Sequence, residues 1–276
     1  MVMNETRDDD NQGSRLSRQA ARQQAMTRMI MTEGSVRIEQ LAETFDVSIM
    51  TVHRDLDELE SRGLLRKSRG VATAMPTALV ESSDVYRSNR EAVEKESIAL
   101  AALELIEPGQ AIMIDDSTTA MHMVPHLRAR RPLTVITNTL TIMDQLRDAP
   151  GISLIGIGGK YFNWCSSYMG RLATTMISSM RADVCIMSTA AITDDIAFHQ
   201  DLDTVDVKQA MFAASAQRIL LADHTKFTRR ALHTLFPLSD FDAVVVDWRT
   251  PLAQISHLRE MGVKVIVAPR RQAAAR

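Results

Sequence analysis

The sequence predicts an α/β protein in two parts: a small, mainly helical N-terminal unit and a larger C-terminal unit built around a parallel sheet. Three observations support this prediction. The chain has 276 residues, which is room for about two domains of ordinary size. Apolar residues follow helical spacing up to about residue 62, whereas short continuous apolar runs alternate with helical stretches after residue 91. Between them, residues 75–90 carry Pro76 and several small or polar residues, as a linker does.

Composition excludes several classes of protein. Hydrophobic residues make up 45% and charged residues 24%, which excludes disordered, collagen-like and coiled-coil chains. Two cysteines, Cys165 and Cys185, are too few for a disulfide framework or a Cys-rich zinc site and fit a reducing, cytoplasmic setting. No apolar run approaches the ~18 residues of a membrane helix, and the polar N-terminus lacks the apolar core of a signal peptide. We therefore expect no metal, no cofactor and no membrane partner.

Charge changes along the chain at the same borders. Residues 1–13 have one Arg against four acidic residues, and residues 1–15 are expected to form a disordered tail. Residues 14–74 have ten Lys+Arg against eight acidic residues, a charge of +2, and form the one positive segment. This excess is modest, so charge alone does not establish nucleic-acid binding.

The N-terminal unit, residues 16–74, begins with a predicted pair of helices. The first covers about residues 17–32 and is stopped by Gly34. The second is short, with Ile38, Leu41 and Phe45 at the spacing of a buried face.

A third helix and a hairpin complete this unit. The helix begins after Ser48, a good N-cap, carries an apolar stripe of Val52, Leu56 and Leu59, and ends at Gly63. Residues 64–74 then fit two short strands with a turn at 68–70. This order of elements is typical of a winged helix-turn-helix.

The outer face of the third helix is the expected DNA-binding surface. Early positions on such a helix reach base edges in the major groove, and cationic residues of the wing contact phosphates. Arg54 suits a guanine or a phosphate, and the hydroxyls of Ser48 and Thr51 suit either phosphates or bases. The alternative is a helical dimerisation module with a solvated charged face. The residues expected to contact DNA are Ser48, Met50, Thr51, His53, Arg54, Arg66, Lys67 and Arg69.

The C-terminal unit, residues 91–270, is predicted to be a Rossmann-like parallel sheet covered by helices on both faces, because its apolar runs are short, continuous and separated by helices. A helix over residues 91–105 opens it. The expected strands are residues 111–114, 133–136, 153–157, 184–187, 219–222, 243–246 and 263–267.

Polar clusters follow four of these strands, at residues 115–119, 137–139, 158–160 and 223–226. Ligands of such sheets bind beyond the carboxyl ends of the strands. Hydroxyls and free N–H groups at a helix start bind anions, and a lysine from another loop adds a full charge. The combination suits a small phosphorylated ligand, although each cluster taken alone is equally an N-cap or a tight turn. Neither GxGxxG nor GxxxxGK is complete, which disfavours dinucleotide and P-loop sites.

Residues 36–70 closely resemble the DNA-binding domain of the DeoR family of sugar-metabolism repressors. The family pattern is VS..T.RRDL..LE..G.L.R..GG. Two residues depart from it: His53 stands in place of a first Arg, which leaves the operator sequence open, and Val71 stands in place of a second Gly. The matching residues are Val47, Ser48, Thr51, Arg54, Asp55, Leu56, Leu59, Glu60, Gly63, Leu65, Arg66 and Gly70.

The chain also resembles the family's effector domain, up to about Trp248. That domain is similar to sugar-phosphate isomerases of the ribose-5-phosphate type, and family members bind phosphorylated sugars. The matches include Glu94-Lys95, Asp115 with Thr118 and Thr119, Thr137-Asn138, Gly158-Gly159, Val207-Lys208, and Asp223 with Lys226. The resemblance implies an effector site of Asp115, Ser117, Thr118, Thr119, Thr137, Asn138, Thr139, Gly158, Gly159, Lys208 and Lys226.

Four residues depart from the family pattern in this domain. Ser117, Ser188 and Ala191 stand in place of glycines, and Thr139 replaces a serine. We expect a pocket of related shape with an altered choice of ligand.

Three functions are consistent with these features. The leading hypothesis is a repressor of a carbohydrate-metabolism operon that binds double-stranded operator DNA as a homodimer or homotetramer and is released by a phosphorylated sugar or polyol. The alternative is an isomerase-like enzyme fused to a DNA-binding domain, with Asp115 or Asp223 as the base. Isomerases of this type carry a carboxylate-rich segment after the strand that corresponds to residues 184–187, whereas this chain has Ser188-Thr189-Ala190-Ala191 there. The third is an architectural DNA-binding protein with an inert oligomerisation domain.

Overall fold

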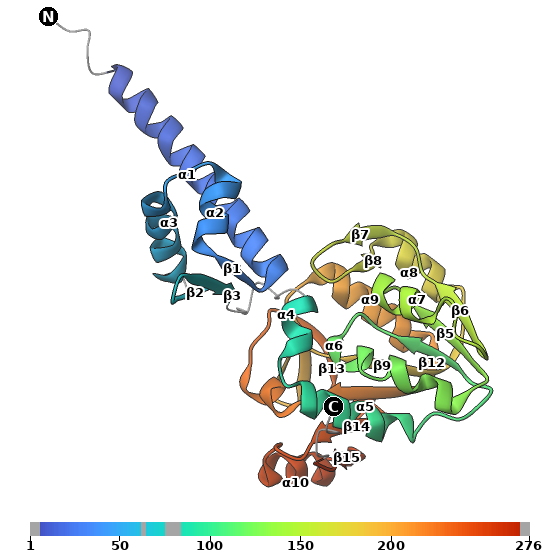
Figure 1. Cartoon of the computed structure of the whole chain (residues 1–276). Helices are drawn as coiled ribbons and strands as arrows, with labels where there is room; N and C mark the ends of the chain where they lie inside the picture. The colour runs from blue at the N-terminus through green and yellow to red at the C-terminus, as the bar shows by residue number, and fades with distance from the viewer. Residues whose placement is uncertain (1–5, 62–64, 75–83, 271–276) are drawn as a thin grey trace, which may run out of the picture. The chain divides into compact units, whose positions relative to one another are not determined.

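The computed structural model describes residues 6–61, 65–74 and 84–270, and its contacts divide the chain into two compact units, residues 1–77 and 78–276 (Figure 1). Each unit has its own hydrophobic core.

The first unit is a winged helix-turn-helix, as predicted. Its three short strands form an antiparallel sheet in the order β1-β3-β2, with Val36 opposite Ala72 and Arg66 opposite Thr73. The elements are α1 (Thr6–Glu33), β1 (Ser35–Arg37), α2 (Ile38–Phe45), α3 (Ile49–Ser61), β2 (Leu65–Ser68) and β3 (Val71–Ala74).

Apolar side chains at helical spacing close this small core. Met26 and Ile30 of α1, Leu41 of α2, and Val52 and Leu56 of α3 are all fully buried. The chain leaves α1 at Gly34, whose positive φ of 75° and hydrogen bond to the Ile30 carbonyl (2.8 Å) end the helix.

Two features of the first unit differ from the sequence-based expectation. Helix α1 begins at Thr6 and therefore includes residues 6–15, which were expected to belong to a tail over residues 1–15. A helix that is already fixed by packing extends at little cost. Strand β1 was not anticipated, because three residues are too short for a periodic pattern. The expected helix stop at Gly63 lies outside the described residues.

The second unit contains a seven-stranded sheet in the order β15-β14-β12-β9-β4-β5-β6, and every neighbouring pair is parallel. All seven expected strands are confirmed, with ends shifted by a few residues. They are β4 (Ala111–Ile114), β5 (Leu133–Thr137), β6 (Ile152–Gly156), β9 (Ala182–Ser188), β12 (Ser215–Ala222), β14 (Ala243–Asp247) and β15 (Val265–Ala268).

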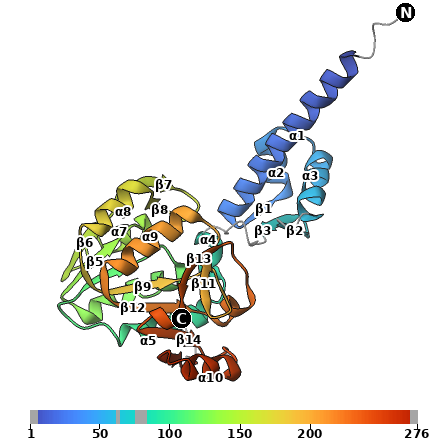
Figure 2. The same ribbon diagram turned by 180° about the vertical axis from the view of Figure 1, so that it is seen from behind.

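Helices cover both faces of the sheet because its strands are apolar on both sides. In β4, Ile112 and Ile114 belong to the core on one face, while Met113 belongs to the core on the other. The first face is covered by α5 (Ala92–Leu103), α6 (Thr118–Met121), η1 (Val124–Arg130) and α7 (Leu140–Leu146). The second is covered by α8 (Arg171–Ser178), α9 (Leu202–Ala213) and α10 (Leu252–Glu260), of which α8 and α9 lie in front of the sheet in Figure 2.

Smaller elements complete the second unit and were not anticipated. One is an antiparallel sheet of β10 (Ala191–Thr193), β11 (Ile196–His199) and β13 (His233–Pro237), and the other is a hairpin of β7 (Lys160–Phe162) and β8 (Ser167–Met169). The short helices η2 (His224–Thr228) and η3 (Leu238–Asp240) flank β13.

Part of the expected linker, residues 75–90, is a helix in the structure. Of the linker, residues 75–83 lie outside the described residues, but α4 (Asp84–Asn89) is a helix of the second unit. The Asp84 backbone N–H donates to the Trp164 carbonyl (3.0 Å), a long-range contact that no local pattern reports. Helix α6 ends at Met121 and is followed by η1, where Pro125 lacks an N–H for an α-helical bond.

Candidate nucleic-acid interface and ligand pocket

Helix α3 begins with a capped first turn. The Thr51 N–H donates to the Ser48 hydroxyl oxygen (3.2 Å), and the Ser48 and Thr51 hydroxyls lie 2.9 Å apart. The predicted N-cap is therefore confirmed.

A buried polar contact fixes the rotation of α3 about its axis. Asp55, 1% exposed, accepts hydrogen bonds from Arg22 Nε (2.6 Å) and Gln23 Nε2 (3.1 Å) of α1. The same Gln23 amide donates to Glu58 (2.8 Å). Since Asp55 points inward beside Val52, the opposite side of α3 points to solvent.

The outward side of α3 carries Met50, Arg54, Asp57 and Ser61, at positions i, i+4, i+7 and i+11. Met50 is 73% exposed, and Arg54 is exposed in the next turn. Five of the predicted DNA contacts therefore lie in the first half of this helix and its cap: exposed Ser48, Met50 and Arg54, and the half-buried Thr51 and His53.

The wing carries the other three predicted contacts. Arg66 and Arg69 are exposed, and Arg69 and Gly70 both have positive φ (49° and 76°), which closes the tight turn between β2 and β3. Lys67 differs, because its ammonium pairs with Asp57 and its backbone N–H donates to Glu60 (2.8 Å). Arg66 and Arg69 are thus exposed, whereas the Lys67 ammonium already has a carboxylate partner.

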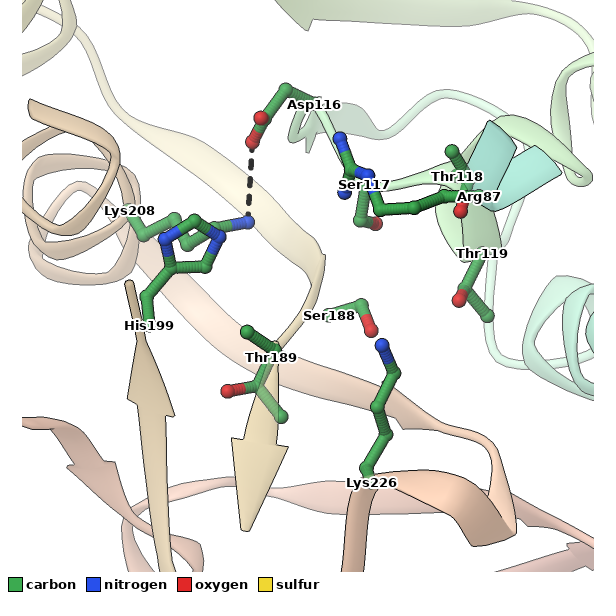
Figure 3. Close-up of a pocket in the computed structure, with 11 residues that line it drawn as sticks. Arg87, Asp116, Ser117, Thr118, Thr119, Ser188, Thr189, His199, Lys208 and Lys226 are labelled. Carbon is green, nitrogen blue, oxygen red and sulfur yellow. Dashed lines mark ion pairs between the residues drawn. The ribbon is translucent and has the colours of Figure 1, made fainter. Parts of the chain in front are cut away.

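In the second unit a polar pocket lies beyond the carboxyl ends of β4, β9 and β12, three adjacent strands of the sheet (Figure 3). This is the position the sequence predicted. Side chains reach it from α4, α6, α9, β11 and η2, and from the segment after β9. The lining residues are Arg87, Asp116, Ser117, Thr118, Thr119, Ser188, Thr189, Ala190, His199, Lys208 and Lys226.

One wall of the pocket is a buried ionic cluster. Lys208, 2% exposed, pairs with Asp115 and with Asp116 (3.3 Å to Asp116 Oδ1). Asp115 also accepts from the N–H groups of Ser117 (3.0 Å) and Ser188 (2.9 Å), so it joins β4 to the end of β9 from beneath the pocket.

The charges of this cluster stabilise one another. Burial alone would raise the pKa of Asp116, but the Lys208 ammonium, with Arg87 and His199, holds that pKa below its usual value. Burial would lower the pKa of Lys208, but Asp115 and Asp116 raise it above its usual value. Lys208, a predicted effector residue, is therefore charged and already neutralises two carboxylates.

The opposite wall carries the other cations. Lys95 of α5 donates to Thr118 Oγ1 (3.0 Å) and to the Arg87 carbonyl. Burial lowers the pKa of Lys95 to about 7, with the positive charges of Lys226, Arg87 and Arg229 adding to the effect and Asp223 opposing it. Asp223 shows the reverse balance: burial raises its pKa, but Lys226 and the Thr225 hydroxyl bring it below its usual value.

Arg87 brings unsatisfied donors to the pocket. Among the described residues, its Nε and Nη2 are buried without a hydrogen-bond partner, and so is the Ser188 hydroxyl. The guanidinium lies 5.7 Å from the Trp164 ring, in a cation–π contact. Figure 3 shows the Lys226 ammonium pointing toward Ser188 from the other side of the pocket. Buried donors of this kind are costly unless a ligand satisfies them.

Six predicted effector residues do not line this pocket. Asp115 belongs to the ionic cluster described above. The other five, Thr137, Asn138, Thr139, Gly158 and Gly159, lie where β5 meets the β7–β8 hairpin. The Asn138 amide donates to the Tyr168 carbonyl (2.9 Å), and the Thr139 N–H donates to Thr137 Oγ1 (3.2 Å). A Cβ on Gly159 would lie 2.6 Å from the Met169 carbonyl oxygen, so this glycine permits a close approach of two backbones.

The sequence reasoning missed several residues of the pocket and its surroundings. Arg87 lies in the expected linker, and Lys95 was matched to the family pattern without being assigned to the site. Thr189 and His199 lie near the unanticipated β10–β11–β13 sheet and gave no signal.

Two further findings concern the described part of the chain. No group of three or more His, Cys, Asp or Glu residues there is arranged to hold a metal ion. Within the same residues, no helix has both the length and the apolar character needed to cross a membrane.

A winged helix-turn-helix joined to a separate α/β unit with a ligand pocket defines the class of ligand-responsive transcription regulators. Residues 22–77 match the DeoR-like helix-turn-helix domain, and residues 90–248 match the DeoR C terminal sensor domain. The chain belongs to the DeoR family.

Curated relatives match along nearly their whole length. The chain is 31% identical to the uncharacterized HTH-type transcriptional regulator YgbI of Escherichia coli (strain K12), over 90% of this chain and 97% of that one. It is 30% identical to the glycerol-3-phosphate regulon repressor of Haemophilus influenzae, over 91% of this chain and 97% of that one. Both names are those of transcriptional regulators. As a member of the DeoR family, the chain is a transcriptional regulator, and the isomerase alternative is set aside.

Solved structures give a partial match. Ribose 5-phosphate isomerase A of Methanocaldococcus jannaschii covers 50% of this chain and 55% of its own, at 13% identity and a TM-score of 0.37. The fold assignment depends instead on the order and parallel registers of the seven strands described above.

Proposed function

We propose that this regulator represses a carbohydrate-metabolism operon and that a phosphorylated sugar or polyol, bound in the pocket, releases it from its operator. The observation that carries the proposal is the buried Arg87 guanidinium, whose Nε and Nη2 have no partner among the described residues. The name of the Haemophilus influenzae relative, a glycerol-3-phosphate regulon repressor, supports both the sign of regulation and the chemical class.

The two walls of the pocket suit the two ends of such a ligand. A phosphate monoester carries a charge of about −1.5 to −2 at pH 7 and three acceptor oxygens. Arg87, Lys226 and Lys95 supply positive charge, and the hydroxyls of Ser117, Thr118 and Thr119 supply donors. Asp116 and Thr189, on the other side, suit the hydroxyl groups of a sugar or polyol.

The predicted effector residues fall into two groups, those that contact the ligand and those that hold the wall of the pocket. Ser117, Thr118, Thr119 and Lys226 contact the ligand in this proposal, while Asp115 and Lys208 hold the wall that shapes the site. Ser188 and Ala191, which replace family glycines, add bulk at and beside the pocket. This is consistent with a ligand choice that differs from other family members.

The proposal includes an oligomer that acts in the cytoplasm, where operator DNA is reached. A winged helix-turn-helix reads one half-site, so a paired operator requires at least two copies of the chain, as a homodimer or homotetramer. Ligand binding coupled to DNA binding is typically worth about 1–3 kcal/mol, or about 5–150-fold in operator affinity.

Fluorescence anisotropy tests the proposal. The full-length protein is titrated onto operator DNA, obtained by in vitro selection from a random pool, at one fixed salt concentration because phosphate contacts make affinity salt-dependent. A panel of pentose, hexose and polyol phosphates is then added, with the unphosphorylated compounds as matched controls. We expect one phosphate ester to weaken binding by about 5–150-fold while its unphosphorylated partner has no effect. A complex unaffected by the whole panel contradicts the effector.

A further inference from the structure

The recognition helix presents a large apolar side chain where base edges are read. Met50 is 73% exposed and Ile49 beside it is 49% exposed, in the first turn of α3. Single exposed apolar residues are ordinary on a protein surface. Met50, however, stands on the outward face together with Arg54, opposite the inward side that Val52 and Asp55 define.

The polar side chains near Met50 on α3 already have partners within the protein. Ser48 and Thr51 bond to each other at the cap, and Asp57, further along the outward face, pairs with Lys67 of β2. The first half of the outward face is therefore formed by a thioether and a guanidinium, Met50 and Arg54.

The chemistry of methionine limits what it can read. A thioether has no N–H or O–H to donate and is a weak acceptor, so it recognises a base by apolar contact. Among the four DNA bases, the one apolar group on a major-groove edge is the 5-methyl group of thymine. A methylated cytosine presents the same group at the same place.

We infer that Met50, with Ile49 beside it, reads the 5-methyl group of a pyrimidine in each operator half-site, and that this group is a thymine methyl. The inference rests on α3 being the DNA-reading helix, as proposed above. In this arrangement Arg54 supplies the charged contact of the same face, and Met50 supplies discrimination between thymine and the other bases.

Removal of single methyl groups tests this inference. Each thymine of the selected operator is replaced in turn by deoxyuridine, which lacks only the methyl group, and affinity is measured by fluorescence anisotropy at fixed salt. We expect one thymine per half-site at which the replacement weakens binding about fourfold, the equivalent of ~0.8 kcal/mol for one buried methyl-sized group. At that position, 5-methylcytosine is expected to bind more tightly than cytosine.

Variants connect the methyl group to Met50. In Met50→Ala and in Met50→Gln, which keeps the side-chain length, the thymine and deoxyuridine operators are expected to bind equally well. Met176→Ala, the same change at a 38% exposed methionine of α8 in the other unit, is expected to keep the fourfold difference.

The possible outcomes distinguish failure of the Met50 inference from failure of the proposed DNA interface. An operator with no thymine sensitive to loss of its methyl, or a sensitivity that survives in both Met50 variants, overturns the role of Met50 while leaving DNA binding by α3 intact. If 5-methylcytosine binds more tightly than cytosine, but no thymine binds more tightly than deoxyuridine, the choice of thymine is overturned. A wild-type protein that selects no sequence contradicts the DNA interface itself.

Discussion

Two buried lysines at the pocket show how the surroundings of an ammonium group decide its role. Lys208 lies between two carboxylates, which raise its pKa and keep it charged. Lys95 lies against a hydroxyl, a carbonyl and other cations, and burial lowers its pKa to about 7. The first therefore stabilises the fold, and the second is free to change protonation when a ligand binds.

Removal of Lys208 tests its structural role. In Lys208→Met, Asp115 and Asp116 remain buried side by side without their counter-charge, so the free energy of unfolding is expected to fall by about 3–5 kcal/mol. Urea unfolding followed by tryptophan fluorescence reports this unit, since Trp164 and Trp248 are the chain's two tryptophans. Adding Asp115→Asn to Lys208→Met removes one of the uncompensated charges and is expected to recover part of the loss.

A matched control and a contrary outcome exist for this prediction. Lys264 is exposed, so Lys264→Met is expected to change the free energy of unfolding by no more than ~0.5 kcal/mol. If Lys208→Met behaves like Lys264→Met, the cluster does not support the fold.

Protonation of Lys95 links ligand binding to pH. An anionic ligand favours the charged lysine, so the pKa of about 7 rises when the ligand binds. Below pH 7 Lys95 is already charged, whereas above pH 7 binding must take up a proton. We therefore expect ligand affinity to fall as pH rises from 7 to 9, by at most about tenfold per unit. Over this range the phosphate is mostly doubly charged, because its second pKa is about 6, and it adds little slope.

Isothermal calorimetry in two buffers of different ionisation enthalpy measures the proton uptake directly. The charged groups around Lys95 are Lys226, Arg87, Arg229 and Asp223. The slope is expected to disappear in Lys95→Met. A Lys95→Met protein with the wild-type pH dependence would assign the proton to another group.

At the scale of single elements, one buried carboxylate sets the orientation of the recognition helix. Asp55 connects α3 to Arg22 and Gln23 of α1, whereas Asp57, two residues on, pairs with Lys67 at the surface. The two residues have the same chemistry on the same helix but differ in burial: Asp57 has a side-chain exposure of 61% against 1% for Asp55.

This difference gives a paired prediction. Asp55→Ala removes the acceptor of Arg22 Nε and one of the two acceptors of the Gln23 amide, and is expected to destabilise the first unit by about 1–3 kcal/mol. Asp57→Ala breaks an exposed ion pair and is expected to cost under ~1 kcal/mol. Hydrogen exchange of the α1 and α3 amides measures both effects in the element concerned. Equal effects of the two substitutions would mean that burial at Asp55 does not stabilise the α1–α3 contact.

For the chain as a whole, the position of α4 in the sequence relates ligand binding to DNA binding. It is the first described element after residues 75–83, which follow the winged helix-turn-helix, and it carries Arg87 of the pocket. A ligand that bonds to Arg87 therefore acts on the element closest in sequence to the DNA-binding unit.

Substitution of Arg87 is expected to weaken effector binding while leaving operator binding unchanged. Arg87→Gln removes the charge and one of the unsatisfied donors, so the effector is expected to bind at least about tenfold more weakly, as for loss of a charged hydrogen bond. Operator affinity without effector is expected to stay within about twofold of wild type. Arg128→Gln, at an exposed arginine of η1, is the control and is expected to respond normally to the effector.

Anisotropy on the selected operator, with and without the active phosphate ester, measures both quantities. If the effector releases the Arg87→Gln protein from the operator at the same concentration as it releases the wild type, Arg87 has no role in the response to effector. Loss of operator binding without effector would instead assign α4 a role in DNA binding.

Local sequence determined most of the secondary structure. The seven strands follow from continuous apolar runs such as residues 111–114, because a parallel strand buried on both faces has no polar position. The N-cap at Ser48 and the inward stripe of Val52, Leu56 and Leu59 follow from helical geometry alone. These features depend on neighbours within a few residues, so a single sequence is sufficient to predict them.

The tertiary structure alone decided which polar clusters share one site. Residues 117–119 and 137–139 look alike in sequence, yet the first lines the pocket and the second joins β5 to the β7–β8 hairpin. Arg87 and Lys95 meet Thr118 because α4 and α5 pack against α6, across more than 20 residues of chain. The sequence by itself established a DNA-reading helix and a parallel sheet with polar strand ends, because those depend on local patterns. Which side chains meet at the pocket, and which of its lysines is neutralised, depends on long-range packing and burial, which no local pattern encodes.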